Sequence, residues 1–205
     1  MGDLGFYFEM GWHHIIAWDA LDHLLFVLAL SAIYLIGNWR QVLVLVTAFT
    51  IGHSLTLALS IYDIIRIEDK WVEFLIPCTI IVTALLNMLE KDYEPRSLRV
   101  NYFLALFFGL IHGLGFANAL RFMLAKDQAI GWSLLGFNIG LEAGQIVVVL
   151  GILLVGFILV RKWRLKVKGS EERIEIDFQR KWWVWSLSVV ALGIAAKMAW
   201  DRFPA

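Results

Sequence analysis

Long apolar runs separated by short polar segments constrain the fold of this chain more than any other feature. A membrane-spanning helix needs roughly 17–25 predominantly apolar residues. Six runs meet that length, at about 21–37, 41–62, 71–89, 100–122, 130–160 and 183–200. Residues 4–17 are too short and too polar to span and are expected to form a short N-terminal interfacial helix. The sequence therefore predicts an all-α polytopic membrane protein with about six transmembrane helices.

The composition agrees with a membrane protein and excludes several other classes. The chain is 60% hydrophobic, and its 18 basic and 18 acidic residues cancel. No bulk charge therefore favours nucleic acid, and the lipid bilayer is the expected surrounding partner. Ten Trp residues suit helix ends at the membrane interface. The single cysteine, Cys78, excludes an intrachain disulfide and a zinc–thiolate cluster.

Charge in alternate loops predicts how the chain sits in the membrane. Twelve Lys and Arg residues fall in the segments on one side and six on the other. The positive-inside rule then places both termini outside. One transmembrane domain is expected over 1–205, with an outer interfacial segment at 1–20 and a cytoplasmic basic loop at 161–182. A turn signal and an alternating stretch leave a short hairpin open within that loop, beside a simple solvated connector.

The segment 11–30, GWHHIIAWDALDHLLFVLAL, concentrates ionisable residues where the first apolar run begins. Asp19, Asp22 and His23 lie at i, i+3 and i+4, so a helix would project them from one face. His13 and His14 precede them by one or two turns. Carboxylates and imidazoles at the edge of an apolar medium are costly unless something binds them. We expect this segment to be the centre of a functional site.

Other helices are predicted to bring ionisable groups to the same depth. Counting about 1.5 Å per residue along each span places His53, His112 and Glu142 in the outer half of the membrane. His14, Asp22 and His23 fall at the outer end of the first span. Asn138, Glu142 and Gln145, at i, i+4 and i+7, form one stripe. Since intramembrane ionisable residues are functional candidates by default, a shared polar site is expected in the outer leaflet.

The residue types in this set favour a transition metal. Imidazole and carboxylate without thiolate suit Zn, Ni, Co or Cu(II) more than Mg or Ca. The candidate ligands are His14, Asp22, His23, His53, His112 and Glu142. The secondary candidates are His13, Asp19, Asn138 and Gln145. Asp22 and Glu142 could also orient an imidazole from outside the ligand set.

Four successive motifs carry a resemblance to a known family. They are GWHH with DALDHLLFVLAL, TAFTIGHSLTLAL, FGLIHGLGFANAL and FNIGLEAGQ, within 11–145. They resemble the motifs of the HupE/UreJ family, small bacterial membrane proteins associated with hydrogenase or urease maturation and regarded as nickel or cobalt permeases. The resemblance implies a bacterial inner membrane and roles for His14, Asp22, His23, His53, His112 and Glu142. His14 precedes Asp22 by eight residues, where the family signature has six, which indicates a divergent branch.

Three functions remain open at this stage. The first is a permease that captures a divalent transition metal outside and passes it inward. The second is a zinc-dependent intramembrane hydrolase, with Glu142, Asp22 or Ser54 assisting a metal-bound water. The third is a non-catalytic assembly subunit with a hydrogen-bonded polar core, which docks a membrane-complex partner or a second copy of the chain. A permease needs a polar route to the other membrane face, and Asn87 and Glu90 are the obvious candidates for it.

Overall fold

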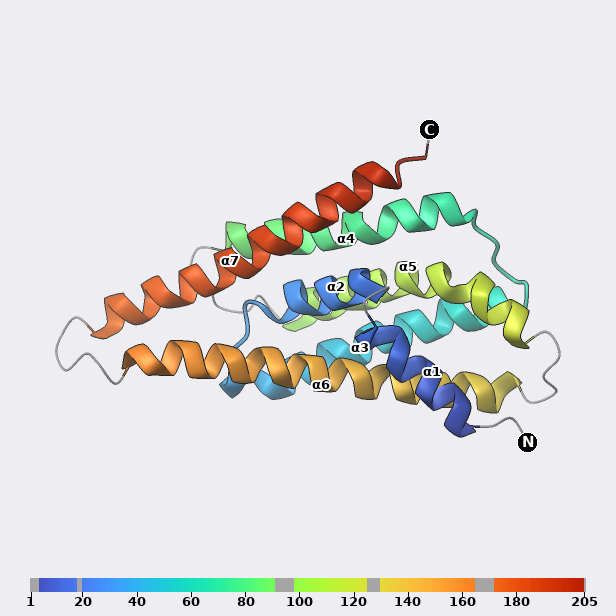
Figure 1. The fold of residues 1–205 in the computed structure, drawn as a ribbon, viewed down its shortest axis with the longest axis horizontal. Helices are drawn as coiled ribbons and strands as arrows, with labels where there is room; N and C mark the ends of the chain where they lie inside the picture. The colour runs from blue at the N-terminus through green and yellow to red at the C-terminus, as the bar shows by residue number, and fades with distance from the viewer. Residues whose placement is uncertain (1–3, 18–19, 91–97, 125–129, 165–171, 205) are drawn as a thin grey trace.

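The computed structural model of this chain describes residues 4–17, 20–90, 98–124, 130–164 and 172–204. All regular elements in these ranges are helices, which confirms the all-α prediction. In chain order they are α1 (Leu4–Ile16), α2 (Leu21–Ser31), the 3-10 helix η2 (Ile36–Asn38), α3 (Trp39–Ile61), α4 (Asp69–Leu89), α5 (Leu98–Leu124), α6 (Ile130–Arg164) and α7 (Glu172–Asp201). They form an elongated bundle in which α1 begins and α7 ends at the same end (Figure 1).

Five helical segments are long and apolar enough to cross a membrane: η2 with α3, α4, and the apolar parts of α5, α6 and α7. α1 and α2 pass the same test only as a pair, and their axes differ in direction by 68°. The predicted first span, 21–37, is therefore wrong as a continuous helix. α2 has 11 residues and is about 16 Å long, half of the hydrocarbon thickness. Counted as one broken span, α1 and α2 supply a sixth crossing.

The end of α2 is held by one side-chain hydrogen bond from its own last residue and by one from a distant helix. The Ser31 hydroxyl donates to the carbonyl of Val27 at 2.5 Å. The Asn87 side-chain amide, from α4, donates to the carbonyl of Ala29 at 2.6 Å. That carbonyl would otherwise accept the backbone N–H of Ile33. Because α4 satisfies it, α2 can end inside an apolar stretch.

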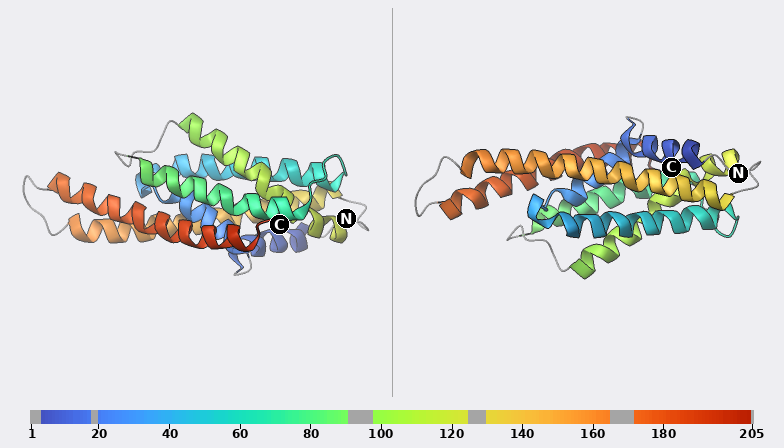
Figure 2. Two further views of the ribbon diagram at one scale, coloured as in Figure 1. Left: turned by 90° about the horizontal axis from the view of Figure 1, so that it is seen from above. Right: turned by 90° about the horizontal axis from the view of Figure 1, so that it is seen from below.

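α6 and α7 extend beyond the other helices at the end of the bundle opposite to the start of α1 (Figures 1 and 2). α6 has 35 residues, or about 52 Å, more than one crossing requires. The run at 130–160 is therefore part of one helix that is longer than the predicted span. The alternative of a hairpin in the basic loop is wrong, since α7 already begins at Glu172. Residues 165–171 lie outside the described ranges.

Two helix pairs, α3 with α5 and α1 with α6, form the most extensive contacts. Both depend on glycines that face the backbone of the partner helix. A Cβ on Gly109 would lie 2.2 Å from the carbonyl oxygen of Phe49, and one on Gly140 would lie 2.0 Å from that of Phe8. Only glycine permits backbones to approach this closely. These contacts hold the helices that carry the histidines at fixed positions.

Candidate metal centre

Four of the five histidines converge in the bundle, each from a different helix. His14 lies in the last turn of α1 and His23 in the first turn of α2, on either side of the break between these helices. His53 comes from α3 and His112 from α5. The ring centre of His23 lies 4.5 Å from that of His14, 6.0 Å from that of His53 and 5.1 Å from that of His112. The bend therefore brings ligands from both halves of the broken pair to one point.

Several of the ring nitrogens are buried and without a hydrogen-bond partner among the described residues. They are His14 Nε2, His23 Nε2, His112 Nδ1 and both nitrogens of His53. His53 and His112 are fully buried. A buried polar group without a partner costs about 1–3 kcal/mol. Four such side chains in one place are accounted for if their nitrogens bind something that the chain does not supply.

Asp22 determines which nitrogen of His23 is available. Its Oδ1 lies 2.9 Å from His23 Nδ1 and also accepts the backbone N–H of His23 at 2.8 Å. An ionised carboxylate only accepts hydrogen bonds, so Nδ1 carries the proton. The unprotonated Nε2 of His23 then faces the other histidines. A carboxylate that orients an imidazole in this way is typical of metal-ligating histidines.

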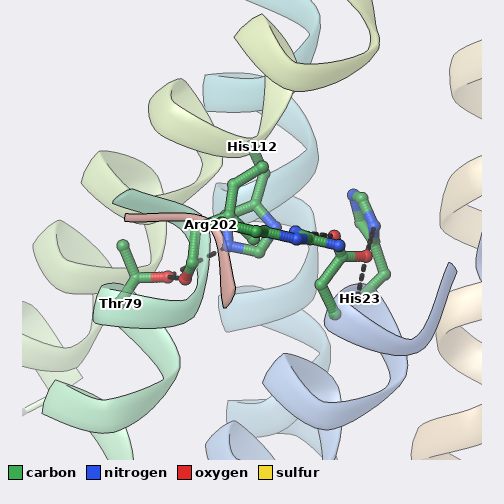
Figure 3. Close-up of polar contacts among 6 residues, drawn as sticks. His23, Thr79, His112 and Arg202 are labelled. Carbon is green, nitrogen blue, oxygen red and sulfur yellow. Dashed lines mark hydrogen bonds and ion pairs between the residues drawn. The ribbon is translucent and has the colours of Figure 1, made fainter. Parts of the chain in front are cut away.

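The hydrogen bond to Thr79 determines which ring nitrogen of His112 carries the proton (Figure 3). The hydroxyl of Thr79 lies 3.0 Å from His112 Nε2, and it donates its one proton to the carbonyl of Ile76 at 2.7 Å. The hydroxyl must therefore accept from a protonated Nε2, which leaves Nδ1 of His112 with a free lone pair. Two histidines of the cluster are thus held in the tautomer that a metal ligand needs.

The side-chain geometry is close to that of a three-histidine metal site. One nitrogen from each of His14, His23 and His53 lies within 4.8 Å of the other two. Metal–nitrogen bonds of about 2.0–2.1 Å separate tetrahedral ligand nitrogens by about 3.4 Å. Small side-chain rotations would close this difference. His112 lies outside the group of three but abuts His23.

A cleft of about 440 Å³ leads from the surface to this cluster. His14, His23 and His112 line its inner part, and His53 lies behind them, since it is not part of the lining. Other polar residues of the wall are His13, Asp22, Glu73 and Arg202. The guanidinium of Arg202 lies 3.4 Å from Asp22 Oδ2 (Figure 3). The cluster is therefore reached from the end of the bundle where α7 ends.

The remaining predicted site residues lie elsewhere or make other contacts. His13 is exposed and 3.8 Å from Glu9. The carboxylate of Glu142 accepts from Thr47 at 2.6 Å, and Gln145 accepts from Thr50 at 2.9 Å, so both join α6 to α3. Asn138 is half-buried with its Oδ1 unpartnered among the described residues. The Ser54 hydroxyl donates to its own helix at Thr50. Asp19 lies outside the described residues.

Three contributors were missed in the sequence: Glu73, Thr79 and Arg202. Glu73 had a detectable signal, because an acid near the start of an apolar run is unusual. Pro77, four residues later, also lacks the N–H that would bond the Glu73 carbonyl. Thr79 and Arg202 had no comparable signal, since their partners lie 33 and 180 residues away.

Comparison with known proteins agrees with the motif analysis. Searches of curated proteins and of solved structures gave no match to this chain. A family model described as "HupE / UreJ protein" matches residues 1–199. The family predicted from the four motifs is thus confirmed over nearly the whole length, and this metal-related membrane protein belongs to the HupE/UreJ family.

Proposed function

We propose that this protein is a membrane permease for a divalent transition metal ion, with His14, His23 and His53 as its capturing ligands. The observation that carries the proposal is the convergence of three imidazoles on one point at the inner end of an open cleft. Asp22 orients His23, and His112 offers a fourth nitrogen. Imidazole ligands suit Ni, Co, Zn and Cu(II), which are the candidate substrates.

The unpartnered ring nitrogens argue against the assembly-subunit alternative. A hydrogen-bonded core would pair its histidines with protein groups, whereas five ring nitrogens of the cluster have no partner among the described residues. Such a core is destabilised by every unpaired group. A bound cation would remove that cost by accepting the lone pairs of these nitrogens. Metal binding therefore accounts for the arrangement of the histidines.

For the location we propose the bacterial inner membrane, with both termini and the cleft on the periplasmic side. The excess of Lys and Arg at the other end of the bundle supports this orientation. An ion that enters from the periplasm moves down the membrane potential. That potential contributes about 2.3 kcal/mol per charge per 100 mV, and a divalent ion gains twice that.

Uptake into proteoliposomes tests the proposal. The purified protein is reconstituted into liposomes that enclose a metal-sensitive dye. An inside-negative potential is imposed, and Ni²⁺, Co²⁺, Zn²⁺ or Cu²⁺ is added outside. We expect saturable uptake of at least one ion. His14→Ala and His53→Ala should each weaken binding by more than about 100-fold, because loss of an outer-shell partner alone costs 10–100-fold.

Ile16→Ala is the matched control, since Ile16 lies on the same helix two residues after His14, is exposed and is not part of the cleft wall. It should keep the wild-type binding and uptake. Equal losses in Ile16→Ala and His14→Ala would contradict the assignment. Absence of binding for all four ions would contradict the metal site itself.

A zinc-dependent hydrolase is the second candidate, because the cleft leaves one side of the three-histidine set open. Catalytic zinc sites typically hold the ion with three protein ligands and keep the fourth position for water. In this alternative a resident Zn²⁺ would supply a water of lowered pKa, and Asp22 and Glu73 are the acids of the cleft wall that would assist it. Stoichiometric zinc that survives chelator washes, without any uptake, would favour the hydrolase over the permease.

A further inference from the structure

A second cavity lies at the other end of α2. It has a volume of about 40 Å³ and lies between α2, α4 and α5. A single water needs about 10–15 Å³ of such volume, so the cavity is large enough for a small ion or for water. Five polar residues line it: Tyr34, Thr83, Asn87, Glu90 and Asn101.

α2 connects this cavity to the histidine cluster. Its first turn carries Asp22 and His23, and Leu30, near its end, lines the cavity. The two sites are thus about 11 Å apart along one short helix. The carbonyl end of a helix carries partial negative charge and favours cations. Discontinuous membrane helices place such ends at ion sites.

A polar stripe on α4 runs between the same two sites. Thr79, Thr83 and Asn87 lie at i, i+4 and i+8 on one face, and all three are buried. The stripe begins at the bond between Thr79 and His112. It ends at Glu90, a half-buried carboxylate in the wall of the second cavity. A buried polar face along one helix is what an ion or its water needs to pass an apolar bundle.

Each polar group of the stripe also has a local structural contact. Thr83 donates to the carbonyl of Thr79 at 2.8 Å, a common arrangement in membrane helices. Asn87 holds the end of α2 through the carbonyl of Ala29. These contacts use the donors of both side chains and leave the amide oxygen of Asn87 as an acceptor. They account for the donors of Thr83 and Asn87.

The chemistry of the second cavity suits release of a cation. Asn101 donates to the hydroxyl of Tyr34 at 2.6 Å, so that hydroxyl keeps its own proton for another acceptor. Oxygen donors bind Ni, Co, Zn and Cu(II) less tightly than imidazoles do. Arg180 donates to the carbonyl of Ile33, a lining residue, at 3.5 Å, but does not itself line the cavity.

We propose that this cavity is a second cation site, at which an ion released by the histidines is held by Glu90 before it leaves the bundle. The α4 stripe from Thr79 to Asn87 is the route between the two sites. The inference rests on the proposed permease function for the direction of movement. The existence of a cation site at Glu90 does not depend on transport and can be tested separately.

Equilibrium binding tests the site first. The purified protein is dialysed against increasing Ni²⁺ or Mn²⁺, with bound metal measured by elemental mass spectrometry. We expect two classes of metal-binding sites. His53→Ala should remove the tight class, and Glu90→Gln should remove a second class that binds at least 10-fold more weakly. Leu89→Gln, next to Glu90 but 72% exposed, is the matched control and should keep both classes. A protein without a weak class, or a weak class unaffected by Glu90→Gln, overturns the proposal.

Proteoliposome uptake then tests the route. Glu90→Gln and the volume-matched Thr83→Val should each lower the uptake rate by at least 10-fold, while the affinity of the tight class changes by less than 2-fold. Val82→Thr, which adds a hydroxyl on the exposed neighbouring face, should transport as wild type. Unchanged uptake in Glu90→Gln overturns the route. If the wild-type protein shows no uptake, the permease function and the route both fail, and the weak class alone decides whether Glu90 binds a cation.

Discussion

At the scale of single residues, the contact between Asp22 and His23 connects the fold to the proposed chemistry. The carboxylate is 14% exposed and is adjacent in sequence to the imidazole that it orients. Its position in the first turn of α2 also places a negative charge near the positive end of the helix. One side chain therefore stabilises the start of α2 and selects the nitrogen that faces the cluster.

Asp22→Asn should weaken metal binding without unfolding the protein. The amide keeps the shape of the carboxylate but no longer requires a proton on Nδ1 of His23. We expect the Kd for the tight class to rise by roughly 10–100-fold, as for other outer-shell partners of metal-bound histidines. Competition with a chromophoric chelator measures the change. Asp201→Asn, which affects an exposed acid paired with Lys197, should leave the Kd unchanged, and an equal effect of both substitutions would contradict the role of Asp22.

Arg202→Gln should have the opposite effect on the Kd. The guanidinium lies in the cleft wall, where it repels an approaching cation and occupies Asp22 Oδ2. Removal of this charge should lower the Kd for a divalent ion by roughly 5-fold at low salt. The gain should shrink as ionic strength rises, because this side chain is 32% exposed. Arg66→Gln removes an exposed arginine paired with Asp63 and is the control; tighter binding in both variants would indicate a general charge effect.

The residue types of the candidate site could be predicted from the sequence, but their pairing could not. Histidines in apolar helices are conspicuous, and a count of residues along each span placed His53 and His112 at one depth. Glu142 belonged to the same pattern, yet it bonds Thr47 on the flank of α3. The rotation of each helix about its axis decides such contacts, and a depth count contains no information about rotation.

At the scale of elements, the break between α1 and α2 is the feature that hydropathy could not reveal. Residues 21–37 are apolar throughout most of their length, so a window average continues across Ser31. The helix ends there because Asn87, 58 residues away, bonds the carbonyl of Ala29. A hydrogen bond from a distant side chain satisfies a carbonyl that the next helical turn would otherwise have bonded, and hydrophobic periodicity cannot predict such a bond. The short α2 is what allows the bundle to hold polar sites at both of its ends.

Gly140→Ala tests the contact that holds α1 in place. The added Cβ would lie 2.0 Å from the carbonyl oxygen of Phe8, so α1 must move away from α6. We expect a loss of about 1–3 kcal/mol in stability, together with weaker metal binding because α1 carries His14. Thermal unfolding in detergent and chelator competition measure the two effects.

Gly151→Ala is the control on the same helix, since a Cβ there meets nothing within 4 Å. It should change the stability by no more than about 0.5 kcal/mol. If Gly140→Ala binds metal as the wild type does, the position of α1 is not important for the cluster.

At the scale of the whole molecule, the two ends of the bundle differ in a way that suits directed movement of a cation. The histidine cleft opens toward the end where α7 finishes. The cavity at Glu90 lies toward the end from which α6 and α7 protrude. That second end also carries most of the basic residues, which the positive-inside rule assigns to the cytoplasm. Nitrogen ligands thus lie on the proposed entry side and oxygen ligands on the proposed exit side.

Cysteine labelling tests this arrangement in intact cells and inverted vesicles. In a Cys78→Ser background, single cysteines replace exposed residues at Leu4, Gly37, Glu68 and Phe203. A membrane-impermeant maleimide should label the Leu4, Glu68 and Phe203 positions from outside and Gly37 only in inverted vesicles. The reason is that α1 with α2 crosses once, and each of the five long helices then crosses once more.

The position at Leu4 distinguishes a broken span from a re-entrant pair. If it reacts on the same side as Gly37 while Glu68 and Phe203 react on the other, α1 and α2 enter and leave through one face. That result would contradict the packing of Leu4 against Gly136 at the start of α6, and His14 would be lost from the proposed ligand set. Labelling of Leu4 together with Phe203 instead fixes six crossings, and it places the break between α1 and α2 within the membrane, where two half-helices can present His14 and His23 to one ion.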